Sequence, residues 1–218
     1  MIDLHTHSTF SDGELIPAEL IRRAKVAGYR ALAITDHADA SNIDLIVGNV
    51  RRLTESYGHF FDIDVLAGVE LTHVPPALMA EFADMARRAG AQILVAHGET
   101  VVEPVAQGTN LAAIEAGVDV LAHPGLITEV EVSLAAERGV ALEITTRRGH
   151  SYANGHVAAL ARRLGARLVI DNDAHAPGDL VSQEMRAKVA LGAGLTQEDI
   201  SQAERNAREI MERCRGGR

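Results

Sequence analysis

Short apolar segments alternate with longer amphipathic segments along the whole chain. Seven apolar segments, each about 4–7 residues long and mostly aliphatic or β-branched, are predicted to be strands. They are Ile2–His5, Ala31–Thr35, Asp64–Glu70, Gln92–Ala96, Asp119–Ala122, Ala141–Thr145 and Arg167–Asp171. Because apolar residues occupy both faces of these strands, we expect both faces of their sheet to be covered, as in parallel sheets.

The segments between the strands carry helix boundary signals. Proline fits the first turn of a helix because that turn leaves its amide groups unpaired, and glycine fits the left-handed cap after the last turn. The helices predicted on these signals are Pro17–Ala27, Pro76–Ala89, Asn110–Ala116 and Asn154–Leu164. Repeated alternation of strand and helix predicts a parallel sheet with right-handed crossovers.

Histidine and acidic residues lie at or just beyond the carboxyl ends of almost all the predicted strands. They are His5, His7, Asp12, His37, Glu70, His97, His123, Asp173 and His175. Parallel α/β folds build their sites at this edge. The outer strands of an open sheet could hardly direct their ends to one point, whereas a closed barrel does so. The sequence therefore predicts a seven-stranded, TIM-like (β/α)7 barrel with parallel strands.

These residue types suit metal binding. Residues i and i+2 of a strand share a face, so His5 and His7 can chelate one ion, and Asp173 and His175 repeat the spacing. Imidazole together with carboxylate suits Zn²⁺, Mn²⁺ or Fe²⁺ better than Mg²⁺ or Ca²⁺, which favour oxygen ligands. Six imidazoles and three carboxylates are too many for one ion, so we expect two to three divalent metal ions.

The ordinary alternative for a single histidine is a hydrogen-bonded core residue, and His97 alone would be interpreted that way. The succession of donors on consecutive strands favours ligands instead. Two other histidines, His59 and His156, are expected to be solvated or capping residues. His73 and His150 lie nearer the predicted rim, and their role stays open at this point.

Composition and charge narrow the function. The 218 residues are 47% apolar and 23% charged, an ordinary globular balance that excludes a disordered chain. A net charge of −9 disfavours binding to long nucleic acids, whose phosphates it repels. The single cysteine, Cys214, and the lack of a signal-peptide pattern or a membrane-spanning apolar segment predict a cytoplasmic protein.

Other catalytic schemes fit poorly. Cys214 lies at the end of a predicted C-terminal helix, which covers Gln197–Arg213, with no histidine near it in sequence, and this argues against a thiol nucleophile. The chain also lacks the G-x-S-x-G nucleophile elbow, the phosphate-binding P-loop and the G-x-G-x-x-G dinucleotide motif.

Together these motifs make the chain resemble the polymerase and histidinol phosphatase (PHP) family. The residues that carry the resemblance are His5-x-His7 with Ser11-Asp12-Gly13, Thr35-Asp36-His37, Gly68-Val69-Glu70, His97, Ala122-His123-Pro124 and Asp173-x-His175. The resemblance extends from residue 3 to residue 175. It implies one PHP-type domain over residues 1–218, a distorted (β/α)7 barrel with C-terminal helices from about residue 179.

The resemblance also implies how the donors are shared among up to three ions. The implied ligands are His5, His7, Glu70 and Asp173 for the first ion, Glu70, His97 and His123 for the second, and Asp12, His37 and His175 for the third. Glu70 would bridge the first two ions.

The expected activity is that of a metal-dependent phosphoesterase, a histidinol-phosphatase-like hydrolase of a small phosphomonoester. A metal-bridging hydroxide would attack phosphorus, with Glu70 and Asp173 holding the reacting centre. A rim histidine, His150 or His73, or a metal-bound water would protonate the leaving oxygen. The arginine pair Arg147 and Arg148 follows a strand without ligands, and either is a candidate to bind the substrate phosphate.

Three alternatives to this activity share some of these features. One is a phosphodiesterase or exonuclease acting on short nucleotides. Another is a non-catalytic scaffold similar to a ribonuclease P protein subunit, which would have lost ligands and gained a basic face. The amidohydrolases also begin with an HxH strand, but the carboxylated lysine they commonly use cannot form here, because both lysines, Lys25 and Lys188, lie in predicted helices.

Overall fold

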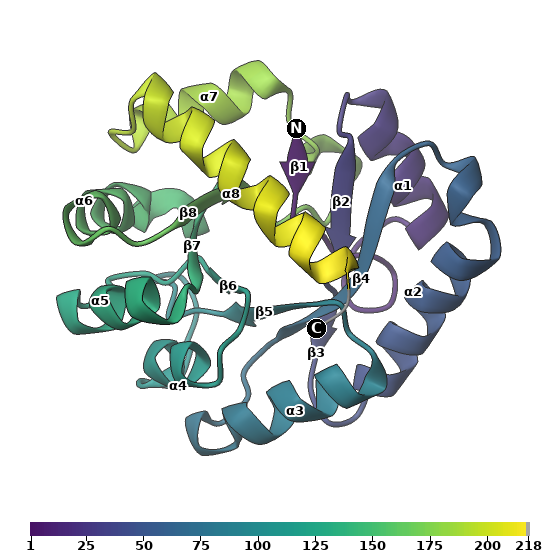
Figure 1. Ribbon diagram of the computed structural model, residues 1–218, viewed down its shortest axis with the longest axis horizontal. Helices are drawn as coiled ribbons and strands as arrows, with labels where there is room; N and C mark the ends of the chain where they lie inside the picture. Colours follow the sequence, from purple (N-terminus) through teal and green to yellow (C-terminus); the bar gives the residue numbers. More distant parts are fainter. Residues whose placement is uncertain (217–218) are drawn as a thin grey trace.

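Seven parallel strands form a nearly closed barrel in the computed structural model, which describes residues 1–216 (Figure 1). The strand order is β1-β2-β4-β5-β6-β7-β8, and each pair is parallel. The strands are β1 (Ile2–Asp3), β2 (Ala31–Ile34), β4 (Asp64–Leu71), β5 (Ile93–His97), β6 (Val120–Ala122), β7 (Ala141–Thr145) and β8 (Leu168–Asp171). The predicted (β/α)7 barrel is therefore confirmed.

An eighth short strand, β3 (His37–Ala38), follows β2 and pairs with the same neighbouring strand, β4. Ala31 of β2 pairs with Asp64 at the start of β4, and His37 of β3 pairs with Glu70 near its end. The two segments thus form one interrupted member of the barrel. The interruption directs His37 and Glu70 to the same edge.

Helices surround the strands and cover the outside of the barrel (Figure 1). They are α1 (Pro17–Val26), α2 (Ile43–Tyr57), α3 (Met79–Ala89), α4 (Thr109–Glu115), α5 (Glu129–Arg138), α6 (Asn154–Leu164), α7 (Gln183–Gly192) and α8 (Gln197–Arg215). Short 3₁₀ helices cover Gly58–Phe60, Pro76–Leu78, His150–Ala153 and Pro177–Asp179. No helix among residues 1–216 has the length and apolar character needed to cross a bilayer.

Most predicted boundaries agree with the structure to within one or two residues, and two differ for physical reasons. The segment predicted as one helix over Pro76–Ala89 starts with a 3₁₀ turn, and α3 begins only at Met79. Tighter turns of this kind are common where an α-helix starts. The first strand stops at Asp3 and not at His5, because the amides of Leu4 and Thr6 donate to the side chains of Asp171 and Thr35.

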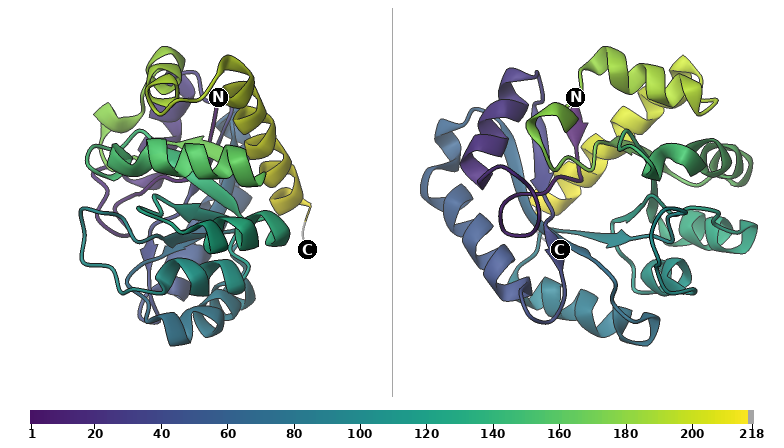
Figure 2. Two further views of the ribbon diagram at one scale, coloured as in Figure 1. Left: turned by 90° about the vertical axis from the view of Figure 1, so that its left-hand side faces the viewer. Right: turned by 180° about the vertical axis from the view of Figure 1, so that it is seen from behind.

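The helix α8 closes the amino-terminal end of the barrel. Figures 1 and 2 show it crossing this end diagonally. Its buried side chains pack against residues of the barrel interior such as Leu4, Leu66 and Val95. The buried side chains of α8 in this cluster are Ala207, Ile210, Met211 and Cys214. The helix thus completes the core and leaves the carboxyl end of the barrel as the open end.

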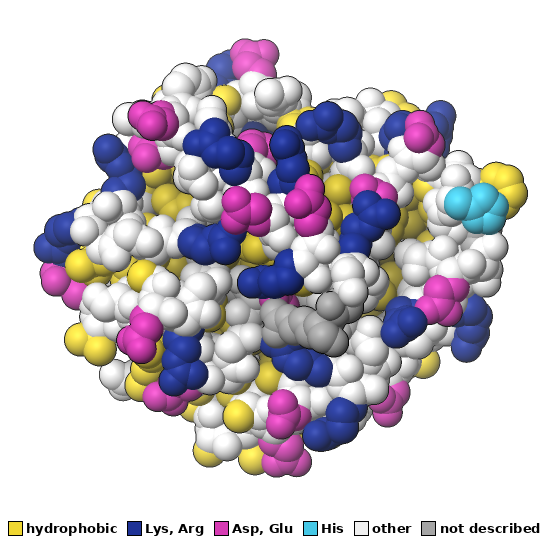
Figure 3. Space-filling view, viewed as in Figure 1, with side chains coloured by type: hydrophobic (Ala, Val, Ile, Leu, Met, Phe, Trp, Pro, Cys, Tyr) yellow, Lys and Arg dark blue, Asp and Glu magenta, His cyan; other side chains and the backbone are white. Residues whose placement is uncertain are grey.

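The face that α8 covers carries a mixed charge. Figure 3 shows basic and acidic side chains interspersed over this face, with hardly any histidine among them. Most of the histidines instead follow the carboxyl ends of the strands. The face covered by α8 therefore has neither the single sign of charge nor the imidazoles expected of the predicted site.

The seam between β1 and β8 closes the barrel largely through side chains. The only backbone bridge across it among the described residues pairs Thr6 with Ala174, beyond the ends of both strands. Elsewhere a buried carboxylate spans the gap on each side. Leu4 N donates to Asp171 Oδ1 at 2.8 Å, and Asn172 N donates to Asp3 Oδ1 at 3.2 Å.

A buried arginine from α7 neutralises this seam. Arg186 is 3% exposed and donates to the carbonyl oxygens of Ile2, at 2.8 Å, and Ile170. It therefore joins the last residues of β8 to the first residues of β1. Its charge also opposes the buried carboxylates of Asp3 and Asp171, each of which has its pKa raised by burial.

Replacing Arg186 with alanine should lower the free energy of unfolding by about 3–5 kcal/mol, because the buried carboxylates at the seam would lose their counter-charge. Urea unfolding followed by circular dichroism measures the change. Arg205→Ala removes an exposed arginine from α8 and should change the free energy of unfolding by less than about 0.5 kcal/mol. Equal stability of the two variants would contradict the role given to Arg186.

Candidate metal centre

All nine predicted donors meet at the open, carboxyl end of the barrel. They form four overlapping groups, and within each group one nitrogen or oxygen per residue lies within 4.8 Å of the others. The groups are His5, His7 and Glu70; His5, His123 and Asp173; Glu70, His97 and His123; and His7, Asp12, His37 and His175. The structure thus brings every predicted ligand into one cluster.

The spacing of the first donors matches the edges of a coordination polyhedron. Donors about 2.1 Å from an ion stand about 3.0–3.4 Å from one another in octahedral or tetrahedral geometry. The Nε2 atoms of His5 and His7 are 3.0 Å apart. His7 Nε2 lies 3.2 Å from Asp173 Oδ1, and His5 Nε2 lies 3.3 Å from Glu70 Oε1. These four residues can therefore surround one ion.

Glu70 connects this group to the next. Its Oε1 atom also lies 3.6 Å from His123 Nε2, and Glu70 groups with His97 and His123 as a second possible binding set. Glu70 is fully buried at the end of β4, between the strands that carry the other donors. A carboxylate with two oxygens in this position can serve two ions at once.

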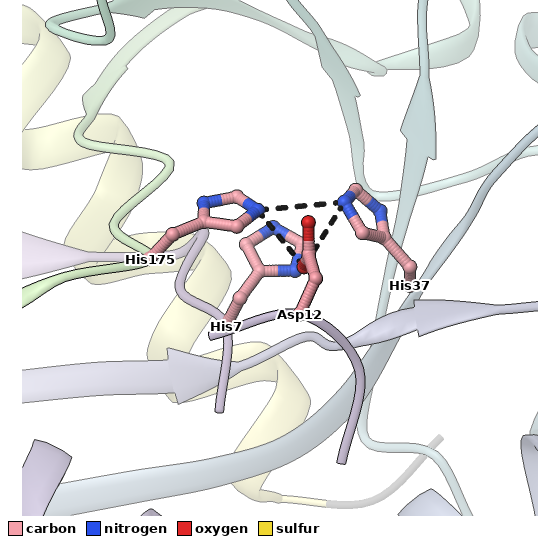
Figure 4. Close-up of side chains that lie close together, drawn as sticks. All are labelled: His7, Asp12, His37 and His175. Carbon is pink, nitrogen blue, oxygen red and sulfur yellow. Dashed lines mark hydrogen bonds and ion pairs between the residues drawn. The ribbon is translucent and has the colours of Figure 1, made fainter. Parts of the chain in front are cut away.

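The third group is more exposed. Figure 4 shows the imidazoles of His37 and His175 directed at the carboxylate of Asp12, with His7 beside them. Asp12 Oδ1 lies 3.1 Å from His175 Nε2 and 3.5 Å from His37 Nε2, and the two imidazole nitrogens are 3.4 Å apart. His7 thus lies next to this group as well as in the first one.

Several buried polar atoms in the cluster have no hydrogen-bond partner. Buried polar groups are nearly always paired, because an unpaired one loses its hydration without compensation. The unpaired atoms of the donor residues are His7 Nδ1, Glu70 Oε1, His123 Nδ1 and Asp173 Oδ1. The two carboxylate oxygens face imidazole nitrogens across distances that suit shared coordination, so this donor set fits divalent metal ions.

The buried carboxylates differ in their protonation. Burial would raise the pKa of Glu70, but the imidazoles of His5, His37 and His97 outweigh burial and hold this pKa well below its usual value. Burial raises the pKa of Asp173 to about 7, assisted by the negative charge of Glu70 and opposed by His5. Glu70 therefore keeps a negative charge at the centre of the cluster.

The imidazoles divide in the same way. Burial would lower the pKa of His5, but Glu70, Glu143 and Asp173 raise it well above its usual value. Burial lowers the pKa of His7 well below its usual value, with His37 and His5 adding to the effect. Neutral His7 offers a lone pair to a cation, whereas His5 must release a proton before it binds one. Metal binding should therefore release protons.

Backbone strain is concentrated at this end of the barrel. Apart from glycine, the residues with a positive φ among the described residues are Asp62, His73, His123 and Asp173. His123 and Asp173 are donors of the cluster, with φ angles of 26° and 52°. Such conformations cost of order 1–3 kcal/mol and persist where the surrounding structure imposes them.

Glu143 supports the cluster and was missed by the sequence analysis. It is fully buried on β7, the strand that supplies no donor. Its Oε1 atom lies 2.7 Å from His5 Nδ1, and its Oε2 atom accepts from the amide of His123 at 2.9 Å. A proton on His5 Nδ1 leaves Nε2 free to bind an ion. The available signal was a charged residue within the apolar strand Ala141–Thr145.

Asp36 is another support that sequence reasoning did not assign. It follows β2 and is fully buried. Its carboxylate accepts hydrogen bonds from the amides and hydroxyls of Ser8 and Ser11, at 2.7–3.1 Å. Gly13 completes this loop, because a Cβ there would lie 2.5 Å from the carbonyl oxygen of His7. The loop holds Asp12 toward the cluster.

The other predicted site residues lie around the cluster. Arg147 Nη1 donates to the carbonyl oxygen of Asp173 at 3.1 Å, and its Nε atom lies 3.5 Å from Asp173 Oδ2. Arg148 is exposed, and within residues 1–216 no hydrogen bond or ion pair joins it to the cluster. His150 is 8% exposed, and its ring centroid lies 4.3 Å from that of His123. His73 is half exposed beside His97, with ring centroids 5.5 Å apart.

The two histidines expected outside the site are indeed absent from the four groups. His59 is exposed in the 3₁₀ helix after α2, and its ring lies against Phe60. The Nε2 atom of His156, in the first turn of α6, lies 2.7 Å from the carbonyl oxygen of Ile127.

A parallel α/β barrel with a multinuclear metal-binding cluster at its open end defines a class of hydrolase folds. The PHP domain family model matches residues 3–116, and the chain belongs to this family. It is 50% identical over 200 residues to an uncharacterized protein of Methanocaldococcus jannaschii. The aligned residues cover 91% of this chain and 92% of that protein. The resemblance proposed from the motifs is thus confirmed.

Two more distant proteins are also similar. The DNA polymerase/3'-5' exonuclease PolX of Bacillus subtilis is 25% identical over 193 residues, which cover 79% of this chain but only 34% of PolX. The crystal structure of the "putative histidinol phosphatase hisK" from Listeria monocytogenes superposes on this chain with a TM-score of 0.60 at 14% sequence identity. It covers 82% of this chain and 97% of that one, a likeness of fold alone.

Replacing Glu143 with glutamine should weaken metal binding about 10–100-fold, because His5 would lose the carboxylate that fixes its proton on Nδ1. Titration calorimetry of metal-stripped protein with Zn²⁺ or Mn²⁺ measures the affinity. Glu137→Gln makes the same change at an exposed site on α5 and should bind metal like the unaltered protein. Indistinguishable isotherms for both variants would argue against this role for Glu143.

Proposed function

We propose that this protein is a metal-dependent phosphoesterase that hydrolyses a small phosphomonoester. The observation that carries the proposal is the convergence of nine donors with separations suited to two or three ions. Such clusters are well matched to hydrolysis of phosphoesters, in which both the attacking and the leaving oxygen carry negative charge. Zn²⁺, Mn²⁺ and Fe²⁺ are the ions that suit imidazole and carboxylate together.

The donors would be shared as the family resemblance implies. His5, His7, Glu70 and Asp173 would hold the first ion, and Glu70 would reach the second together with His97 and His123. The third ion would lie among Asp12, His37 and His175. When bound, the ions supply Lewis acidity to the phosphoryl oxygens and activate a water molecule.

The protein's own groups would orient the substrate and supply a proton. Arg147 projects from the loop after β7 with its side chain 29% exposed, next to Asp173. A guanidinium there can donate two parallel hydrogen bonds to a phosphate. His150 lies on the other side of this loop, buried against His123, from where its Nε2 atom can pass a proton to a leaving oxygen.

The charge around the cluster supports a small substrate. The rim carries the partly exposed carboxylates of Asp12, Glu103 and Asp179, and the whole chain has a net charge of −9. A long phosphate backbone would meet this repulsion at many positions, whereas a phosphomonoester would meet it only at the rim of the site, where the bound cations oppose it. PolX is named as a 3'-5' exonuclease, an enzyme that cleaves phosphodiesters, so a short phosphodiester is the second candidate substrate.

A substrate panel distinguishes these candidates. With Mn²⁺ or Zn²⁺ present, phosphate release should be fastest with phosphomonoesters such as histidinol phosphate, nucleoside monophosphates or p-nitrophenyl phosphate. Bis-p-nitrophenyl phosphate and dinucleotides test the phosphodiester alternative, and N-acyl amino acids test an amidohydrolase. Preference for a diester would shift the assignment to the second candidate. Turnover of amides alone would overturn a phosphoesterase.

His7→Ala should reduce turnover at least about 100-fold, because His7 lies beside both the first and the third groups of donors. The fold should persist, since His7 contributes a ligand and not an apolar contact. His59→Ala removes an exposed histidine from the 3₁₀ helix before β4, outside the four donor groups, and should keep full turnover. Circular dichroism verifies both folds, and retained turnover in His7→Ala would contradict the proposed site.

Arg147→Ala should raise the KM for a phosphomonoester about 10-fold or more, because a charge-assisted contact to phosphate would be lost. Arg148→Ala, a change of the same charge at the next residue, should leave KM within about twofold. Steady-state kinetics on both variants tests the assignment. A larger effect at Arg148 would transfer the phosphate contact to that residue.

A further inference from the structure

Beyond the nine donors, the geometry points to Glu103 as a tenth metal ligand, which completes the second ion's site and which an anionic substrate displaces. This inference rests on the metal cluster of the proposed function. Glu103 lies in the loop between β5 and α4, a segment to which the sequence motifs assign no role. Its carboxylate lies close to His97, one of the three donors of the second set.

The distance from Glu103 to His97 is that of two ligands on one ion. His97 Nδ1 lies 3.1 Å from the carbonyl oxygen of Gly98, an acceptor that fixes the proton on this nitrogen. The lone pair of His97 is therefore on Nε2. Glu103 Oε2 lies 3.2 Å from this Nε2 atom. Two donors bound side by side to one ion are separated by about 3.0–3.4 Å.

The loop holds Glu103 in place from both ends. The amide of Glu99 donates to Asn110 Oδ1 at 2.9 Å, and the Glu99 carboxylate accepts from the amides of Gly108 and Asn110. Asn110 Nδ2 also donates to the carbonyl oxygen of Pro124, which connects the loop to the residues after β6. These hydrogen bonds therefore fix both ends of the loop that carries Glu103.

A surface carboxylate in an ordinary ion pair meets one partner, whereas Glu103 meets three imidazoles. Its Oε2 atom lies 3.2 Å from His97 and 3.7 Å from His73, and its Oε1 atom lies 3.3 Å from His150. One oxygen therefore faces the candidate ligand and the other faces the candidate proton donor. This arrangement places a negative charge where a bound phosphate would need to contact both.

Exposure identifies Glu103 as the exchangeable member of the second set. Its side chain is 37% exposed, whereas those of Glu70, His97 and His123 are 0%, 3% and 1% exposed. Solvent therefore reaches this set of donors on the side of Glu103. A phosphate approaching from solvent would meet the carboxylate first and would have to replace it on the ion.

Metal titration tests the ligand role without any measurement of turnover. Glu103→Gln keeps the shape of the side chain and removes its charge, and one binding step for Zn²⁺ or Mn²⁺ should weaken at least about 10-fold. Glu137→Gln, which changes an exposed carboxylate on α5, serves as the matched control and should bind like the unaltered protein. Calorimetry on metal-stripped protein resolves the steps.

The outcomes separate this inference from the proposed function. If the unaltered protein binds two or three ions and Glu103→Gln binds them equally well, Glu103 is not a ligand and the proposed function stands. If the unaltered protein binds no ions, both proposals are overturned. Weakening of one step in Glu103→Gln alone supports the tenth ligand.

Orthophosphate binding tests the displacement. With the metal sites saturated, Glu103→Gln should bind orthophosphate several-fold more tightly than the unaltered protein, because the anion no longer competes with a carboxylate. Calorimetry measures this affinity too, and Glu137→Gln should show no change. Equal or weaker binding of orthophosphate by Glu103→Gln would overturn the displacement.

Discussion

Closure of the barrel between β1 and β8 is the constraint on which the metal centre depends. His5 and His7 follow β1, and Asp173 and His175 follow β8, so the first and last strands supply four of the nine donors. They face one another only because the two strands become neighbours. The chain achieves this with little backbone pairing, through buried carboxylates and an arginine that bridge the gap. The contacts that stabilise the seam therefore also bring these four donors together.

The cluster gathers charged groups and unpaired polar atoms that are costly to bury. Glu70 keeps its negative charge in a fully buried position, and carboxylate and imidazole atoms around it lack hydrogen-bond partners. A core that served stability alone would replace such groups with apolar ones, since buried charges are costly. Their presence, with strained backbone at His123 and Asp173, is typical of a site where binding takes precedence over stability.

The sequence predicted the barrel and the donors well because both follow from local patterns. Apolar strands alternate with helices, and every donor except Asp12 lies within about four residues of a strand end, so the closed topology brings these donors together. Glu143, Asp36 and Glu103 escaped prediction for the opposite reason. Glu143 and Asp36 act on residues far away in the chain, and Glu103 meets the distant His73 and His150 as well as His97, through contacts that exist only after folding.

The same limit explains the smaller differences. The first strand is shorter than predicted because its amides pair with side chains of Asp171 in β8 and Thr35 after β2, which no local pattern reveals. The arginine pair after β7 reads alike in sequence, yet only Arg147 turns toward Asp173. Which neighbour of two faces inward depends on the path of the loop, and that path is a tertiary property.

The position of α8 has a consequence for biosynthesis. The helix fills the amino-terminal end of the barrel with side chains that lie more than 190 residues from those of β1 in the chain. A ribosome releases the amino-terminal donors long before it has made this helix. The apolar interior of the nascent barrel therefore stays uncovered until α8 has been made, so its inner layer assembles late in folding.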